Sequence, residues 1–249
     1  MSRGAARVLV VGVGGLGCPA ALALAHAGVG TLGLCDDDVV ERSNLHRQIL
    51  FDEGDVGTPK LDAAARALRA AVPTVSLRLH RSRLLPGTAL SLVREYDLVL
   101  EGSDNFATKF LAADACRLAG VPVVHASAVR WIGTALAVAA AAAPCYRCLF
   151  EDVPQDGAPN CADAGVMGPV VGVVAAAQVD LGLALLDGRR AEGQLVTFDG
   201  RRDALRRRSV EARRDCPLCG LAPTNHGIEE ARYIGPQGYV ENVVPASAG

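Results

Sequence analysis

Four of the eight cysteines form two pairs that could bind a metal ion. Cys145-Tyr-Arg-Cys148 and Cys216-Pro-Leu-Cys219 are Cys-x-x-Cys pairs with 67 residues between them. Four thiolates in two such pairs can close a tetrahedral zinc site. They leave no position for a zinc-bound water, so we expect a structural zinc that ties a loop to the C-terminal segment. A redox dithiol and buried apolar cysteines are the alternative interpretations.

A glycine-rich turn near the N-terminus has the pattern of a nucleotide site. It follows an unbroken apolar run from Arg7 and precedes an Ala/Leu-rich helical stretch, residues 19–27. Glycines let backbone amides approach a phosphate, and the N-terminus of a helix adds partial positive charge. The next apolar segment, residues 31–35, ends in an acid that can hydrogen-bond a ribose. We predict an adenine-nucleotide site that includes Gly12, Gly14, Gly15, Gly17 and Asp36; a tight turn without a ligand is the alternative.

A set of polar residues follows Asp36 before the next predicted strand: Asn44, Arg47, Gln48 and Lys60. Arginine gives forked contacts to phosphate and lysine a point charge, so this set could close over a triphosphate. Lys60 and Lys109 are the only lysines in the chain. The alternative is that these are solvated residues of a loop and a helix start.

Asp104 and Asn105, which we also place in the predicted nucleotide site, directly follow a predicted strand, residues 97–101. Ligands of open α/β sheets bind beyond the carboxyl ends of the strands. Asp104 could hold Mg²⁺ through one carboxylate, which is the usual sparse protein ligation of that ion. Capping of the following helix is the alternative role, and both could hold.

Strands and helices alternate along the chain, which predicts an α/β fold: a doubly wound, mostly parallel, Rossmann-like sheet with a zinc-tied C-terminal part. The predicted strands are 7–12, 31–35, 75–79, 97–101, 120–125, 134–140 and 194–198. The predicted helices are 19–27, 60–72 (with Thr58 as its cap and Pro59 as its first residue), 89–95, 106–118 and 168–186. A long loop, 144–165, interrupts the pattern, and such loops are often functional.

Composition narrows the class of protein. The chain has 249 residues, 50% of them hydrophobic, and its net charge of -2 gives no reason to expect a nucleic-acid or membrane surface. The longest apolar stretch, 166–186, contains Pro169, Gln178 and Asp180, so we expect a buried helix rather than a membrane span. Eight cysteines without a secretion signal favour a reducing compartment, and we expect a cytoplasmic protein.

Eight motifs occur in a specific order: GVGGLG, Asp36, SNLHRQ, VGTPK, SDN, CYRC, CADAGVMGP and CPLCG. In this order they resemble the ubiquitin-activating-enzyme-like adenylyltransferases of the ThiF/MoeB/HesA type. The resemblance covers residues 7–220, so we expect an adenylyltransferase domain over 1–220 and a C-terminal tail over 221–249. It implies that the glycine turn and Asp36 hold ATP, and that Asp104 serves Mg²⁺. It also implies that Asn44, Arg47, Gln48 and Lys60 surround the phosphates and that the four paired cysteines bind Zn²⁺.

The implied reaction is ATP-dependent adenylation of the C-terminal glycine of a small ubiquitin-like sulfur-carrier protein ending in Gly-Gly. Arg47, Lys60 and Asp104 would be catalytic. Cys161, on the long loop, could attack the acyl-adenylate to give a thioester or, if persulfidated, an acyl disulfide. Its acidic neighbours do not lower the pKa of a thiol, so the catalytic role and a plain loop residue are equally open. The resemblance also implies a homodimer, which we expect as well because the long apolar helix and the apolar strands need cover.

Two departures from the family pattern set further expectations. Members usually begin with a helical segment bearing an arginine that reaches the partner's site, whereas six residues precede Arg7 here. Another residue replaces that arginine, the chain is truncated, or activity is reduced. No rhodanese-like domain follows, so we expect a separate sulfur donor. The rival functions are an NAD-dependent oxidoreductase and a non-catalytic nucleotide-binding partner of an active homologue.

Overall fold

One mixed sheet forms the centre of the molecule. The computed structural model describes residues 2–140, 143–153 and 165–233, and within them the sheet has eight strands in the order β3-β2-β1-β4-β5-β6-β7-β8. Neighbouring strands from β3 through β5 are parallel, and those from β5 to β8 are antiparallel. The strands are β1 (Arg7–Val11), β2 (Thr31–Cys35), β3 (Ser76–His80), β4 (Leu98–Glu101), β5 (Val123–Val129), β6 (Ile132–Val138), β7 (Gln194–Asp199) and β8 (Ala204–Ser209).

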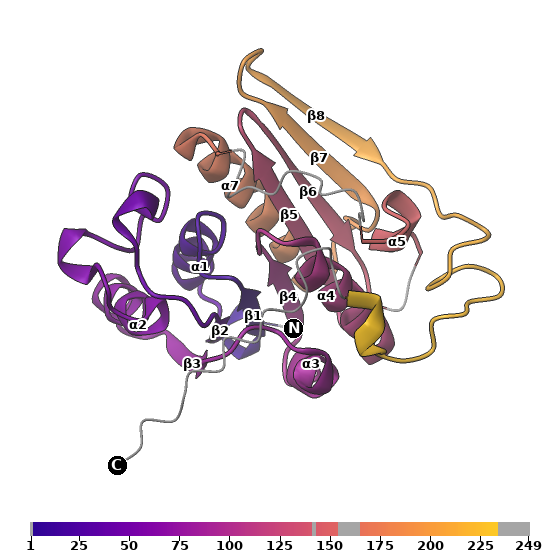
Figure 1. Ribbon diagram of the computed structural model, residues 1–249, viewed down its shortest axis with the longest axis horizontal. Helices are drawn as coiled ribbons and strands as arrows, with labels where there is room; N and C mark the ends of the chain where they lie inside the picture. The colour runs from indigo at the N-terminus through magenta and orange to yellow at the C-terminus, as the bar shows by residue number, and fades with distance from the viewer. Residues whose placement is uncertain (1, 141–142, 154–164, 234–249) are drawn as a thin grey trace.

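The central strands are apolar because helices cover both faces of the sheet. Val8 pairs with Leu32 on one side and Leu98 on the other, and all three side chains are fully buried. The helices are α1 (Gly17–His26), α2 (Lys60–Ala71), α3 (Pro86–Val93), α4 (Phe106–Ala119), α5 (Tyr146–Leu149) and α7 (Gly168–Leu186). Side chains of α1, α2 and α7 share one buried cluster, whereas α3 and α4 pack in a second cluster. Figure 1 shows α1 and α2 beside the parallel strands and β8 at the opposite edge. The predicted doubly wound α/β fold is therefore confirmed.

The helix α7 is long and apolar enough to cross a membrane, but it is a core helix here. It packs against β4, β5, β6, β7 and α1. A Cβ at Gly182 would lie 3.0 Å from side-chain atoms of Leu98 and of Leu100, so glycine permits this close approach to the sheet. The prediction of a buried helix is confirmed.

Several predicted boundaries were wrong, one strand was missed, and the predicted loop 144–165 contains the short helix α5. The helix α2 begins at Lys60 with Pro59 in the cap position, so neither Thr58 nor its side chain caps it. β6 runs two residues earlier than predicted because β5 and β6 form a tight hairpin at Arg130, which has φ 54°. The arginine-rich segment after β7, which no strand was assigned to, forms the edge strand β8. Its side chains are almost all exposed, so it lacks the apolar alternation from which strands are predicted.

The segment after Gly220 is docked on the protein as far as Tyr233. The Tyr233 side chain is fully buried and its hydroxyl donates to Asp114 Oδ2 at 2.9 Å. Arg147 binds both oxygens of the same carboxylate, at 2.8 and 2.9 Å. A buried polar group on α4 thus joins α5 to the short helix η4 (Glu230–Tyr233).

Candidate functional site

Two glycines of the turn after β1 have no room for a side chain. Gly12 has φ 83°, and a Cβ there would lie 3.2 Å from the backbone nitrogen of Ser103. A Cβ at Gly17 would lie 1.9 Å from the carbonyl oxygen of Gly12. The turn therefore holds the N-terminus of α1 against the ends of β1 and β4. That is the point where the strand order reverses, and ligands of doubly wound sheets bind there.

Asp36 ties this turn to the end of β2. One carboxylate oxygen accepts a hydrogen bond from the Val13 N–H at 2.7 Å, and the other from the Asp38 N–H at 2.9 Å. Burial raises the pKa of Asp36, although Lys60 and the two backbone donors oppose the shift. Each carboxylate oxygen has a further lone pair for a ligand hydroxyl. The predicted ribose-binding acid therefore lies beside the glycine turn.

Lys60 brings a buried positive charge to the same place. It is 6% exposed, and its Nζ lies 2.8 Å from Asp38 Oδ2. Its backbone N–H donates to the Asp38 carbonyl at 2.9 Å, which fixes the start of α2 at the end of β2. Burial lowers the pKa of Lys60, but Asp36, Asp38 and Asp104 outweigh it and the net shift is upward. The ammonium stays charged at neutral pH. Asp38 is the partner that sequence analysis missed.

Arg47 lies along the glycine turn from the other side. A Cβ at Gly15 would lie 3.2 Å from Arg47 Cδ, so the absence of a side chain there admits the arginine stem. Its Nη2 donates to Asn44 Oδ1 at 2.5 Å. Gln48 is 3% exposed with Oε1 unpartnered among the described residues, and its Nε2 would lie 3.8 Å from a Cβ at Gly14. The polar set therefore gathers around the glycine turn, as a phosphate site requires.

Asp104 and Asn105 have different surroundings. Asn105, not Asp104, caps α4, because its Oδ1 accepts the Thr108 N–H at 2.8 Å. Asp104 is exposed, and its charge raises the pKa values of Lys60 and of Arg83. For Arg83 the largest cause is its hydrogen bond to Asp37, at 2.9 Å. Arg83 comes from the connection after β3, and no motif in the sequence marks it.

The four paired cysteines form one cluster. Their sulfur atoms all lie within 4.8 Å of one another, with 3.5 Å between Cys145 and Cys216 and 3.4 Å between Cys148 and Cys219. A tetrahedral zinc with Zn–S bonds of about 2.3 Å places its sulfurs about 3.8 Å apart, so the donors fit that ion. A Cβ at Gly220 would lie 2.5 Å from the Cys216 carbonyl oxygen, which explains the glycine that ends the second pair. The cluster joins α5 to the chain after β8.

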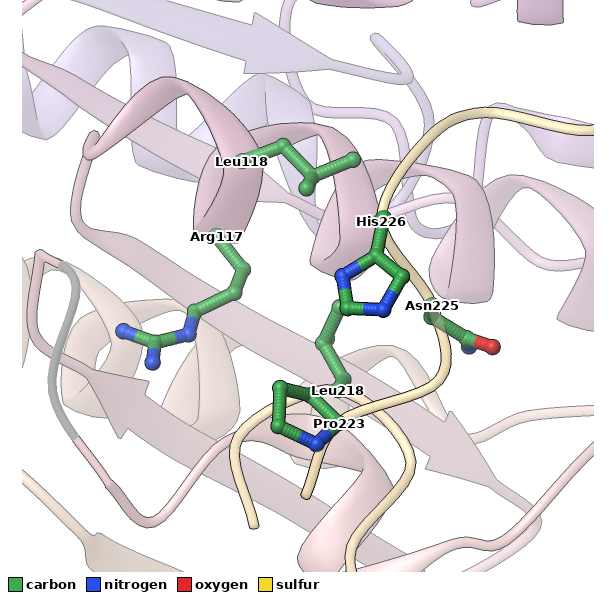
Figure 2. A pocket seen from close by; sticks show the side chains of 6 residues that line it. All are labelled: Arg117, Leu118, Leu218, Pro223, Asn225 and His226. Carbon is green, nitrogen blue, oxygen red and sulfur yellow. The ribbon is translucent and has the colours of Figure 1, made fainter. Parts of the chain in front are cut away.

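A separate open pocket of about 360 Å³ lies beside this cluster. It is lined by Arg117 and Leu118 at the end of α4 and by Leu218, Pro223, Asn225 and His226. In Figure 2 the Arg117 guanidinium extends away from the His226 ring, so the polar groups do not converge on one point. None of its lining residues belongs to the predicted nucleotide site.

Cys161, the predicted catalytic cysteine, lies outside the described residues. Sequence analysis also missed a buried polar group at the end of β4, formed by Glu101, Lys109 and His125. The one available signal was an acid that ends a buried strand, which is an uncommon position for a charge.

Proteins of known sequence resemble this chain over most of its length. The chain is 47% identical over 223 residues to pig (Sus scrofa) "Adenylyltransferase and sulfurtransferase MOCS3", covering 88% of this chain and 49% of that protein. It is 40% identical over 231 residues to the "SAMP-activating enzyme E1" of Haloferax volcanii, covering 92% of this chain and 85% of that protein. The chain thus spans about half the length of the MOCS3 proteins that it matches.

Solved structures show the same fold at lower identity. Escherichia coli MccB superposes with a TM-score of 0.78 and 23% identity, covering 88% of this chain and 68% of that one. The ThiF family model matches residues 4–219, most of the chain, including the glycine turn and both cysteine pairs. This chain belongs to the ThiF family.

Proposed function

We propose that this protein uses ATP to adenylate the C-terminal glycine carboxylate of a small ubiquitin-like sulfur-carrier protein ending in Gly-Gly. The proposal rests mainly on one observation: polar side chains gather around the glycine turn, at the point where the strand order of the sheet reverses. These side chains are Asp36, Asn44, Arg47, Gln48 and Lys60. Family membership supports the reaction type. The names of the mammalian and archaeal relatives, an adenylyltransferase and a SAMP-activating enzyme, support the substrate class.

The reaction shifts negative charge onto the phosphate oxygens and the leaving group, and the site has positive side chains that can stabilise it. A carboxylate oxygen of the carrier attacks the α-phosphorus of ATP, the bond from that phosphorus to the bridging oxygen breaks, and pyrophosphate leaves with the electron pair. The carboxylate is already ionised near neutral pH, so no general base is needed. Lys60 and Arg47 stabilise the charge that develops on the phosphate oxygens and the leaving group.

The Asp104 carboxylate is an oxygen ligand of the kind that Mg²⁺ prefers. We assign this carboxylate, exposed and free of the helix cap that Asn105 provides, as the protein ligand. When bound, Mg²⁺ neutralises charge on the phosphates of ATP. Asp36 accepts the ribose hydroxyls, and Gln48 and Asn44 orient the triphosphate. Zinc has a structural role, holding α5 against the chain after β8.

The later steps and the partners belong to the same proposal. Cys161 is a candidate nucleophile toward the acyl-adenylate, and the sulfur comes from a separate donor protein. The protein works as a homodimer in the cytoplasm.

The test is exchange of labelled pyrophosphate into ATP, with Mg²⁺ and candidate carriers. Arg47→Ala and Lys60→Ala should each slow the exchange by roughly 10²–10³-fold, because each removes one charge facing the phosphates. Arg69→Ala is the matched control, because Arg69 is exposed on α2 and makes no ion pair with a described residue. ATP binding without exchange against every carrier would favour a non-catalytic partner. Tight NADH binding without ATP binding would favour an oxidoreductase.

A further inference from the structure

A buried group of charged side chains lies at the end of β4, next to the predicted nucleotide site. Glu101, the last residue of β4, is fully buried, and its Oε2 lies 2.9 Å from Lys109 Nζ and 3.2 Å from His125 Nδ1. Lys109 is 4% exposed and also donates to the Ala126 carbonyl at 2.6 Å. Burial alone would raise the pKa of Glu101, but Lys109, His125 and Ser103 outweigh it and lower the pKa to about 2. The carboxylate is therefore ionised at every working pH.

The second carboxylate oxygen holds the turn that carries Asp104. Glu101 Oε1 accepts the backbone N–H of Ser103 at 2.7 Å and also the Ser103 hydroxyl. Asp104 is the next residue. The turn, residues 102–105, is therefore tied to the sheet through a side chain as well as through its own backbone.

The 102–105 turn also packs closely against the glycine turn after β1. A Cβ at Gly102 would lie 3.1 Å from Leu16 Cβ, and one at Gly12 would lie 3.2 Å from the Ser103 nitrogen. Because the two turns touch at backbone distance, a shift of residues 102–105 would also move the predicted phosphate site. Loss of the Glu101 carboxylate would therefore affect the 102–105 turn directly and the glycine turn through it.

The choice of lysine at position 109 is informative. The chain has 25 Lys and Arg residues, and only Lys60 and Lys109 are lysines. Both are buried, at 6% and 4% exposed, and each pairs with an acid at the end of a parallel strand, Asp38 after β2 and Glu101 in β4. A compact ammonium can donate to Glu101 and the Ala126 carbonyl in a narrow space, where a planar guanidinium needs more room.

Stability alone is a weak reason to bury such a pair. Desolvation of two charges offsets most of their attraction, and an apolar pair of the same volume often serves the fold equally well. A buried pair does fix geometry, because removing one partner leaves an uncompensated charge. The contacts of Glu101 to Ser103 show that the geometry fixed here is that of the 102–105 turn.

We propose that Glu101, neutralised by Lys109, is a positioning residue that holds the 102–105 turn so that Asp104 can bind the magnesium ion of ATP. The assignment rests on the proposed function, in which Asp104 serves that ion. It adds a group that does not touch the nucleotide. Partners that orient a metal-binding group typically contribute about 10–100-fold to metal affinity.

Calorimetric titration of ATP into the protein, at a series of Mg²⁺ concentrations and in excess EDTA, tests the assignment. It needs no carrier protein. We expect Glu101→Gln to raise the Mg²⁺ concentration for half-maximal ATP binding by about 10–100-fold. ATP binding in EDTA should weaken far less, because the shift reaches the predicted phosphate site only through the contact between the two turns. If Glu101→Gln does not fold, the double variant Glu101→Gln with Lys109→Met removes both charges together and should show the same shift.

Asp114→Asn is the matched control. Asp114 is also a fully buried carboxylate paired with a cation, Arg147, but it has no contact with the 102–105 turn among the described residues. It should lower the melting temperature and leave the Mg²⁺ dependence unchanged. Equal losses of stability in the Glu101 and Asp114 variants, with the Mg²⁺ dependence of both unchanged, would overturn the positioning role alone. Wild-type protein that binds no ATP would overturn the proposed function, and the assignment with it.

Discussion

His125 is a titratable side chain that the fold keeps from water. It is 3% exposed, its Nδ1 meets Glu101, and its Nε2 has no hydrogen-bond partner among the described residues. The centroid of its ring lies 4.4 Å from the ring centroid of Tyr146, which stands between Cys145 and Cys148 in the sequence. Burial lowers the pKa of His125, although Glu101 opposes the shift. The neutral ring is the form that the folded protein accepts.

This makes stability depend on pH in a defined direction. The folded pKa lies below the unfolded value of about 6.5, so the unfolded chain takes up a proton first as the pH falls. The contribution is full above about pH 6.5 and is lost below it, by at most about 1.4 kcal/mol per pH unit. Urea unfolding from about pH 7 to about pH 5 should therefore show a smaller loss of stability in His125→Gln than in wild type. His26→Gln, at an exposed position on α1, should follow wild type, and identical profiles for all three proteins would refute the assignment.

At the residue scale, local patterns predicted side chains that the fold places around the glycine turn, but not all of their partners. Asp36 and Lys60 were recognised because each stands at a fixed place in a strand–turn–helix unit. Glu101 and His125 come from adjacent strands, and Lys109 from the helix between them in the chain, so only the sheet register brings them together. Asp104 was correctly placed at a strand end, whereas the helix cap belongs to its neighbour.

At the scale of elements, two glycines in helices have opposite surroundings. Gly17 begins α1 against the Gly12 carbonyl, whereas Gly172 lies on the exposed side of α7 with nothing within 4 Å of a Cβ. Alanine at 172 should stabilise the protein by about 0.5–1 kcal/mol, because glycine loses more freedom on folding. Alanine at 17 should destabilise it by about 2 kcal/mol or more, since backbone must move to admit the methyl group.

Thermal unfolding of the two variants in parallel measures this contrast. ATP binding should fall in Gly17→Ala and not in Gly172→Ala, because only the first glycine shapes the predicted phosphate site. Equal melting temperatures would show that the turn after β1 relaxes easily, contrary to the packing described above.

Strands β1, β2 and β4 were predictable because they are buried and stand out as apolar runs, whereas the edge strand β3 is half exposed and was predicted from its alternation. The edge strand β8 was not, because its arginines carry no apolar alternation and its pairing with β7 is a tertiary contact. Helix existence was predicted better than helix starts. Pro59 shows why. Proline usually occupies the first position of a helix, but Pro59 has an extended ψ of 130°, so α2 begins one residue later, at Lys60.

At the scale of the whole molecule, the cysteine cluster joins parts of the chain that are distant in sequence. We expect one zinc per chain by elemental analysis. The double variant Cys216→Ser with Cys219→Ser should lose it, and residues 210–233 should then exchange amide hydrogens faster. The control Cys116→Ala, at a buried cysteine on α4 outside the cluster, should keep its zinc. A clean preparation without zinc, or full zinc retention in the double variant, would contradict the assignment.

Homodimerisation is the last prediction, and the structure changes the surface on which it depends. The sequence suggested that α7 needs a partner to cover it, but the chain's own sheet already packs against that helix. Exposed apolar side chains occur instead at Ile49, 60% exposed, and Met167, 37% exposed. Their segments are adjacent, because a Cβ at Gly168 would lie 2.7 Å from the His46 carbonyl oxygen. Contact between copies here would cover this apolar surface beside the predicted phosphate site.

Sedimentation velocity across a range of concentrations tests this. Wild type should sediment as a dimer at about micromolar concentration, and Ile49→Asp should shift it to monomer, because a charge would be buried at the contact. Leu221→Asp is the matched control, since Leu221 is 84% exposed and lies after the second cysteine pair, away from this surface. A wild-type protein that remains monomeric at the highest concentration would refute the dimer. A dimer unaffected by Ile49→Asp would place the contact elsewhere on the molecule.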